Sequence, residues 1–132
     1  MPQGFSLVEM LMVIAVIGII SALVLPQILD IKSGAQNSVA RQQQAQIQTA
    51  LDSWIAAESG KPGGLAAARA LYSDANGAKL QLLQKYLQPS TYDGLSPSGN
   101  SVTSSALDSA NAYLQFSEWP SGGQPTVDWI NR

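Results

Sequence analysis

One uninterrupted apolar stretch, residues 5–25, constrains the fold of this chain more than any other feature. It has twenty-one residues with one charged side chain, Glu9, and reads FSLVEMLMVIAVIGIISALVL. A helix rises about 1.5 Å per residue, so the stretch would extend over roughly 32 Å, enough to cross the hydrocarbon core of a bilayer. The sequence therefore predicts a membrane-spanning helix over residues 5–25.

Glu9 is an unusual residue for such a span. A carboxylate in the apolar part of a membrane costs a few kcal/mol, so an intramembrane acid is by default a hypothesis for a functional site. Glu9 also lies about one turn from the start of the stretch, where its side chain could reach the membrane surface. Two interpretations therefore stand at this point: a functional partner for Glu9, or an unpaired and hydrated carboxylate.

The residues around Glu9 form a recognisable motif. Gly4-Phe5-Ser6-Leu7-Val8-Glu9, running into an apolar helix, resembles the processing signal of type IV pilins and type II secretion pseudopilins. The resemblance implies that a prepilin peptidase cuts after Gly4 and methylates the new N-terminal Phe5. Glu9 then takes the place of the family's glutamate, the fifth residue of the mature chain. Pro26 stands where many members carry a helix-bending proline.

The same resemblance implies a function and a set of partners. The chain would be a homo-oligomeric subunit of a helical filament, built by an inner-membrane assembly platform and a motor ATPase. Its N-terminus would be cytoplasmic, and its body periplasmic, or extracellular after assembly. Glu9 would pair with the new α-amine of a neighbouring subunit and so fix the axial register, because such a pair has a steep distance dependence in a low dielectric. Small residues would let the bundled helices approach closely: Gly18, Ser21 and Ala22.

A second class of function remains open. The chain could be a single-pass membrane anchor that carries a small binding domain and never polymerises. If it is a filament subunit, the sequence does not separate a secretion pseudopilin from an adhesive, motility or DNA-uptake pilin, nor a major from a minor subunit. We expect the mass of the processed N-terminus to discriminate between the two classes.

The leader, residues 1–4, carries no Lys or Arg. A conventional secretory signal would need a positive n-region, a shorter apolar stretch and a small-residue cleavage site, and a plain signal anchor is the other alternative. Prepilin leaders usually carry a basic residue before the glycine. The leader is therefore either minimal, or the true start lies upstream of Met1.

Residues 26–59 continue the helix but are apolar on one side only. Pro26 should bend the helix, because it removes a backbone donor and clashes with the preceding turn. Apolar residues recur at three- or four-residue steps, which predicts an amphipathic helix: Ile28, Ile31, Ala35, Val39, Ile47, Ala50, Trp54 and Ala57. The opposite, polar side is predicted to carry Lys32, Gln36, Arg41, Gln42, Gln44, Gln48 and Asp52.

Residues 60–132 predict a small α+β body. A Gly-rich stretch at 60–64 ends the long helix, and two short helices follow at 65–72 and 78–87, with Pro89 after the end of the second. Residues 90–111 read as a long loop with a short strand at 101–104. Two alternating runs, 112–119 and 126–131, flank a Gly- and Pro-rich turn and predict an antiparallel hairpin.

The fold class is therefore a long N-terminal helix with a small pilin-like body. An isolated hairpin is marginally stable in water and needs a surface to pack on. We expect that surface on the long helix, from Ile47, Leu51, Trp54 and Ile55, with the Leu80 to Leu87 helix nearby. No cysteine is present to staple the body, so the long helix must supply part of its core.

Composition argues against an enzyme. The chain has no His and no Cys, which are the commonest general base and the thiol nucleophile, and no Gly-rich phosphate loop follows a strand. No cofactor is implied. Fragments of an oxygen-ligand loop keep calcium as a candidate, although ordinary turns explain them: Asp74, Asn76 and Asp93.

Nucleic acid is not an expected partner. The net charge is −2 with 12% charged residues, whereas a nucleic-acid binder needs a basic face. Four aromatic residues could form a stacking platform for DNA or, as we favour, the core of a small sheet: Tyr113, Phe116, Trp119 and Trp129.

Overall fold

The structure, a computed structural model, describes residues 4–132, with the side chains of residues 25–30 left outside that description. The chain divides into two compact units, Met1–Ala35 and Gln36–Arg132. Helix α1 (Leu7–Ser59) contributes residues to both units. Pro26, the predicted helix kink, lies outside the described residues.

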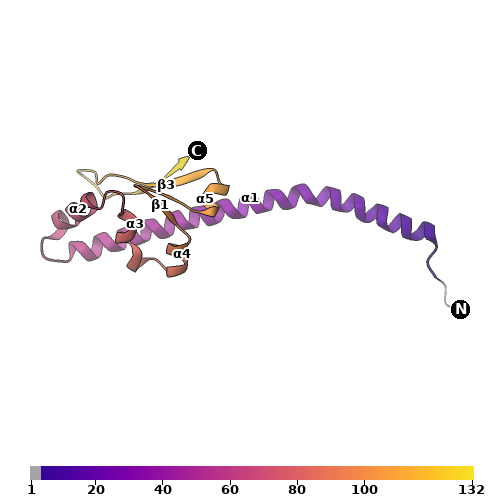
Figure 1. The fold of residues 1–132 in the computed structure, drawn as a ribbon, viewed down its shortest axis with the longest axis horizontal. Coiled ribbons are helices and arrows are strands. Elements are labelled where there is room, and N and C mark those ends of the chain that lie inside the picture. Colours follow the sequence, from indigo (N-terminus) through magenta and orange to yellow (C-terminus); the bar gives the residue numbers. More distant parts are fainter. Residues whose placement is uncertain (1–3) are drawn as a thin grey trace. The chain divides into compact units, whose positions relative to one another are not determined.

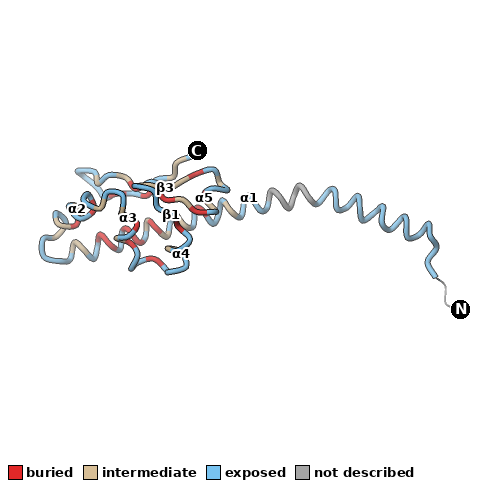
Figure 2. Tube along the Cα trace, in the orientation of Figure 1, coloured by how far each residue is buried: buried red, intermediate tan, exposed pale blue. Residues whose placement is uncertain are grey.

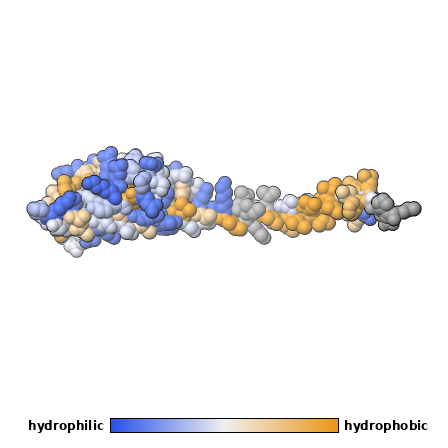
Figure 3. Space-filling model, turned by 90° about the horizontal axis from the view of Figure 1, so that it is seen from below, coloured by the Kyte–Doolittle hydropathy of each residue, from blue (hydrophilic) through white to orange (hydrophobic). Residues whose placement is uncertain are grey.

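In the first unit, α1 is almost wholly apolar between Leu7 and Val24, where Glu9 is the charged residue. The stretch Leu7–Val24 is long and apolar enough to cross a membrane by length and composition, and none of it is buried. Figure 2 shows this stretch as exposed throughout, and Figure 3 shows apolar side chains over its visible face. A helix that is hydrophobic all round belongs in lipid or in the interior of a larger assembly.

In the second unit, the remaining part of α1 supplies the core (Figures 1 and 2). Its buried apolar residues are Ala40, Ile47, Ala50, Leu51, Trp54 and Ile55. The predicted packing surface is therefore confirmed. The longer stripe is not buried at four of its described positions, because Ile31 is 70% exposed, Val39 is 46% exposed, and Ala35 and Ala57 are also exposed. The buried row runs through Ala40 and Leu51 instead.

The body contains one antiparallel sheet. Its four strands lie in sequence order, β1 (Ser96–Ser98), β2 (Ser101–Thr103), β3 (Ala112–Phe116) and β4 (Val127–Asn131). The predicted hairpin is β3 and β4, with Leu114 opposite Trp129 and Phe116 opposite Val127. Buried and more exposed residues alternate along β3 as predicted, since Ala112, Leu114 and Phe116 are buried. The α+β fold class is confirmed.

Glutamines of α1 reach the outer edge of the sheet. Gln44 Nε2 donates to the Val127 carbonyl at 3.0 Å, and the Val127 N–H donates to Gln48 Oε1 at 2.7 Å. Gln43 Oε1 accepts a hydrogen bond from Ser104 Oγ at 2.7 Å. Placing Gln44 and Gln48 on a polar face away from the body was wrong, because their amides satisfy a strand's free backbone groups.

Short helices fill the rest of the body. They are α2 (Gly64–Asp74), α3 (Lys79–Leu82), the 3₁₀ helix η1 (Gln84–Tyr86), α4 (Pro89–Asp93) and α5 (Ser105–Ser109). The α2 prediction is confirmed within two residues at its C-terminal end. The 78–87 helix is instead broken into α3 and η1, although its predicted apolar face is buried: Leu80, Leu83 and Leu87.

Two further predictions about this region were wrong. Pro89 does not follow a helix end but begins α4, where its fixed φ suits the first helical turn and its missing N–H costs nothing. The strand expected at 101–104 is present as β2, but the rest of residues 90–111 is not one long loop, because it also contains β1 and α5. Ser104 caps α5 by accepting a hydrogen bond from the Leu107 N–H at 3.2 Å, which fixes the turn between β2 and α5.

Tyr72 is the most constrained polar side chain of the core. It is 1% exposed, its hydroxyl donates to the Ser117 carbonyl, and its ring lies edge-on to Trp119 with centroids 5.7 Å apart. Burial raises the pKa of Tyr72 above its usual range, since the phenolate would be charged in an apolar setting. Lys79 Nζ lies 4.4 Å from the centroid of the same ring, and burial lowers the pKa of that ammonium.

The raised pKa predicts a loss of stability at alkaline pH. The contribution of protonated Tyr72 to stability is complete below the pKa of about 10 that a tyrosine has in the unfolded chain. Above that pH, the unfolded chain loses the proton while the folded protein keeps it, so the unfolding free energy falls by about 1.4 kcal/mol per pH unit. Denaturation of the full chain in detergent micelles at pH 8 and pH 11, followed by tryptophan fluorescence, measures this loss.

Tyr72→Phe should lack this alkaline loss and be less stable at pH 8 by about 1–2 kcal/mol, since it leaves the Ser117 carbonyl unpaired. Comparison with this variant isolates the tyrosine, because the lowered pKa of Lys79 contributes in the opposite direction in both proteins. Tyr86→Phe, at a 40% exposed position, is the matched control and should keep the loss. An equal loss in Tyr72→Phe would contradict the assignment.

Candidate functional site

The predicted cleavage site precedes the helix. Gly4, Phe5 and Ser6 have no helical structure, and all three are exposed. Among the described residues, no heavy atom lies within 4 Å of a Cβ added at Gly4. The fold itself thus makes no demand for glycine here. A requirement for glycine at this position would have to come from a molecule that binds the segment.

Ser6 and Glu9 hold each other by two reciprocal hydrogen bonds. The Ser6 N–H donates to Glu9 Oε2 and the Glu9 N–H donates to Ser6 Oγ, both at 3.2 Å. The Met10 N–H donates to the Ser6 carbonyl, also at 3.2 Å, as the first bond of the helix. This is a capping box, in which side chains satisfy two backbone donors that a helix N-terminus leaves free.

Sequence reasoning missed this pair, although the signal is present. Ser-x-x-Glu directly before an apolar run is the usual signature of a capping box, and Ser6-Leu7-Val8-Glu9 has it. The sequence-based expectation for Glu9 was a partner on another subunit or a solitary carboxylate. The structure gives Glu9 a partner in its own chain.

The small residues of the membrane helix leave an open surface. Ser21 Oγ donates to the Ile17 carbonyl at 2.8 Å, so its hydroxyl is satisfied within the helix. No heavy atom lies within 4 Å of a Cβ added at Gly18, and Ala22 is exposed. Close approach of a second helix along this face stays a prediction.

The calcium candidates lie on separate elements of the body. Asp74 ends α2, Asn76 lies in the following turn, and Asp93 ends α4. Asn76 Oδ1 accepts a hydrogen bond from Asn100 Nδ2 at 2.9 Å, and Asn100 Oδ1 accepts one from the Gly77 N–H at 3.1 Å. Within the described residues, no three Asp, Glu, His or Cys side chains gather to hold a metal ion.

Three of the four aromatic residues belong to the core of the body or pack against it. Phe116 is buried, and Trp119 and Trp129 pack against the core, while Tyr113 is half-buried. The Arg41 guanidinium lies 3.7 Å from the centroid of the Trp129 ring, a cation–π contact. Arg41 is exposed, as its predicted place on the polar side of the helix implies, and its guanidinium also contacts the body through Trp129.

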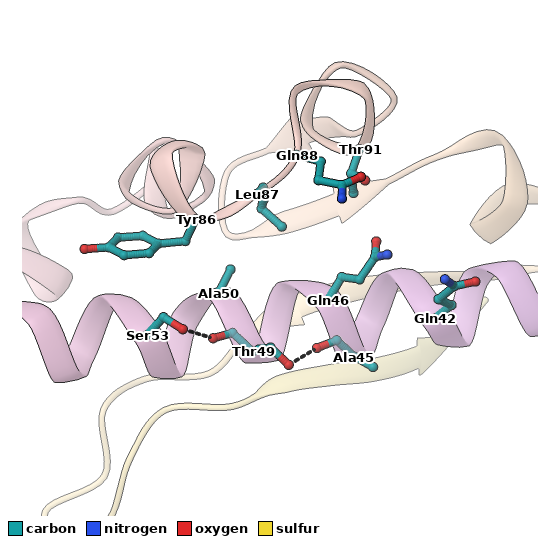
Figure 4. Close-up of a pocket in the computed structure, with 10 residues that line it drawn as sticks. All are labelled: Gln42, Ala45, Gln46, Thr49, Ala50, Ser53, Tyr86, Leu87, Gln88 and Thr91. Carbon is teal, nitrogen blue, oxygen red and sulfur yellow. Dashed lines mark hydrogen bonds between the residues drawn. The ribbon is translucent and has the colours of Figure 1, made fainter.

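A groove of about 330 Å³ lies between α1 and the segment from Tyr86 to Thr91 (Figure 4). Gln46 and Gln88 project into it from opposite sides. The Thr49 and Ser53 hydroxyls donate to backbone carbonyls one turn earlier, at 2.8 and 2.9 Å. The groove is lined by amides, hydroxyls and apolar groups, with no acid–base or nucleophile–base pair that could carry out catalysis.

Comparison with known families identifies the N-terminal segment. Residues 2–25 match the family described as the prokaryotic N-terminal methylation motif. The match contains Gly4, Phe5, Ser6 and Glu9 together with the apolar stretch. The chain shows no significant similarity to a curated protein or to a solved structure.

The matched motif is the signature of proteins related to type IV prepilins and pseudopilins. It implies processing by a prepilin peptidase and a structural role in place of an enzymatic one. The apolar helix that follows the motif fits a membrane-anchored protein. Residues 2–25 thus carry the N-terminal methylation signature that type IV pilin and pseudopilin precursors share.

Proposed function

We propose that the chain is a structural subunit of a type IV pilus-like or type II secretion pseudopilus filament, assembled through its N-terminal helix. The observation that carries this proposal is the stretch Leu7–Val24, which is fully uncovered and begins inside the methylation motif. A stable protein needs such a surface to be buried somewhere. In a filament, other copies of the same helix would bury it.

The energetic argument rests on the exposed side chains of this stretch. Leu7 is 79% exposed, and the other large apolar residues up to Val24 are at least 41% exposed. Burying one such side chain is worth about 1.5–3 kcal/mol. Lipid would cover them before assembly. Extraction into a fibre gives up those lipid contacts, so helix packing must offset the loss and a motor ATPase must drive the step.

Processing would prepare the subunit for assembly. The peptidase cuts between Gly4 and Phe5, releases residues 1–4 and methylates the new α-amine of Phe5. The N-terminus lies on the cytoplasmic side of the inner membrane, and the body is periplasmic, or extracellular once assembled. The exposed, non-helical state of Gly4 to Ser6 supports this proposal, because a peptidase must reach both sides of the bond it cuts.

Glu9 would then set the register of the fibre. Its carboxylate pairs with the Phe5 amine of a neighbouring subunit, and this contact forms at one axial offset only. In an apolar setting the attraction falls steeply with distance, so it discriminates between offsets even where its net contribution to stability is small.

Mass spectrometry of the N-terminus tests the proposal. In cells with an active prepilin peptidase, the chain should begin at Phe5 and carry one methyl group. Gly4→Leu should stay uncut without loss of fold, because the structure has open space at Gly4. Gly122→Leu, which also meets open space but lies in the body, is the matched control and should be cut normally. An intact Met1 in the wild-type chain would leave a tethered domain that does not polymerise.

A further inference from the structure

The two oxygens of Glu9 have different environments. Oε2 accepts the Ser6 N–H at 3.2 Å, whereas Oε1 accepts no hydrogen bond from the described part of the chain. The capping box therefore uses one oxygen and leaves the second for another donor. A carboxylate can accept on both oxygens at once, so the contact with Ser6 and a contact with an ammonium group are compatible.

We propose that Ser6 is a positioning residue for Glu9: the capping box holds the carboxylate at the start of its own helix so that Oε1 can receive the α-amine of a second copy of the chain. This inference rests on the filament function proposed above. It adds that register depends on a serine hydroxyl that never touches the neighbouring subunit.

Ordering of the Glu9 side chain is the physical reason. A glutamate on an exposed helix surface samples several rotamers, and a binding event that fixes it must overcome that entropy. Fixing one such side chain lowers an association constant roughly twofold to tenfold. The capping box fixes the Glu9 side chain in the free subunit, so its conformational entropy is already lost before the neighbouring subunit binds.

The apolar surroundings strengthen this restraint. In water, the Ser6 and Glu9 N–H groups could exchange their side-chain partners for solvent. In the apolar part of a membrane no such replacement exists, and a free backbone donor is costly. The reciprocal bonds should therefore persist longest in the setting where the filament assembles.

Proteolytic processing leaves the capping box intact. The proposed cut lies between Gly4 and Phe5, so the Ser6 nitrogen remains an amide that can donate to Glu9. The new amine arises one residue before the capping serine. The same geometry thus serves the precursor and the mature subunit.

The experiment uses the full chain in cells that contain the peptidase and the assembly machinery. Ser6→Val removes the hydroxyl acceptor, and Ser6→Thr is its matched control, since the two side chains have the same shape. Fibre yield is measured against the amount of cleaved subunit in the membrane over a range of expression levels. Ser6→Val should need about threefold to tenfold more cleaved subunit for the same yield, and Ser6→Thr should match the wild type.

A second measurement tests the geometry directly. Solid-state NMR of the mature subunit in lipid bilayers should place the Ser6 amide nitrogen close to the Glu9 carboxyl carbon in the wild type and in Ser6→Thr. The proximity should be populated less in Ser6→Val, because the backbone N–H of residue 6 can still donate to Glu9 but the reciprocal bond from the Glu9 N–H to the Ser6 hydroxyl is gone. Equal fibre yields for the Val and Thr variants, or equal losses in both, would overturn the inference.

A failure of cleavage, which precedes assembly, leads to a different conclusion. If Ser6→Val stays uncut while the wild type is cut, Ser6 serves the peptidase and the positioning role is overturned. If the wild type itself is neither cut nor assembled, the proposed filament function fails, whatever the Ser6 variants show. The N-terminal mass and the fibre yield thus distinguish the two failures.

Discussion

Replacement of Glu9 by alanine is expected to abolish fibres while the protein stays in the membrane. The proposed register contact needs a negative charge opposite the α-amine of the next subunit, and alanine offers none. Membrane insertion should be unimpaired or improved, because removing a carboxylate from an apolar span removes a cost of up to about 2.5–3.5 kcal/mol. Electron microscopy of sheared fibres and alkaline extraction of the membrane fraction measure the two outcomes.

Two control variants separate charge from helix capping. Glu9→Gln can still form a capping box, since glutamine serves at this position, but it carries no charge and should also fail to form fibres. Glu118→Gln removes one negative charge from an exposed site on the body and should assemble normally. Normal fibres from Glu9→Gln would show that the carboxylate charge does not set the register.

Trp54→Ala is expected to lower the unfolding free energy of the body by about 3–5 kcal/mol. Trp54 is 4% exposed and belongs to the core formed by α1, the short helices and the sheet. Its ring centroid lies 6.4 Å from that of Tyr72, so alanine would leave a large cavity beside a second buried ring. The cost should be high because α1 supplies one wall of a small core.

Denaturation of the full chain in detergent micelles measures this loss, with fluorescence of Trp119 and Trp129 as the signal. Leu71→Ala is the control, because Leu71 is 47% exposed on α2, next to Tyr72 in sequence, and should change the free energy by less than about 0.5 kcal/mol. A loss below about 1 kcal/mol in Trp54→Ala would mean that α1 is not part of the core.

The elements with strong periodicity could be predicted from the sequence. The apolar run and the row through Ile47, Ala50 and Trp54 predicted α1, and the alternation around Leu114 and Phe116 predicted the hairpin. These patterns are reliable because each side chain's environment follows from its place on a single element. The packing of the hairpin on α1 followed, since an isolated hairpin needs an apolar surface to pack on and α1 offered one.

Apart from the strand at 101–104, which is present as β2, the short elements between residues 89 and 111 could not be predicted. Strands of three residues and helices of five carry too little local pattern to be recognised, and contacts elsewhere in the chain stabilise them. Val102 and Leu107 are buried in the core, and Ser104 bonds to Gln43 of α1 at 2.7 Å. Pro89 was misread because proline suits the position after one helix as well as the start of the next.

The roles of polar residues were the hardest to predict. Gln44 and Gln48 have the spacing of a solvent-facing row, but their partner is Val127, 83 and 79 residues further along the chain. No local pattern contains that information. The Ser6–Glu9 pair is different, because its signal is local and the apolar stretch drew attention away from it.

The contacts at Val127 also bear on how copies of the body can meet. An exposed strand edge invites another strand to pair with it. On β4 the two Val127 backbone groups are already occupied by glutamine side chains, and on β1 the central residue, Pro97, has no N–H to offer. Both borders of the sheet therefore resist strand addition at these positions. Crowding many bodies around a common bundle of helices would then carry little risk of sheets fusing into amyloid-like ribbons.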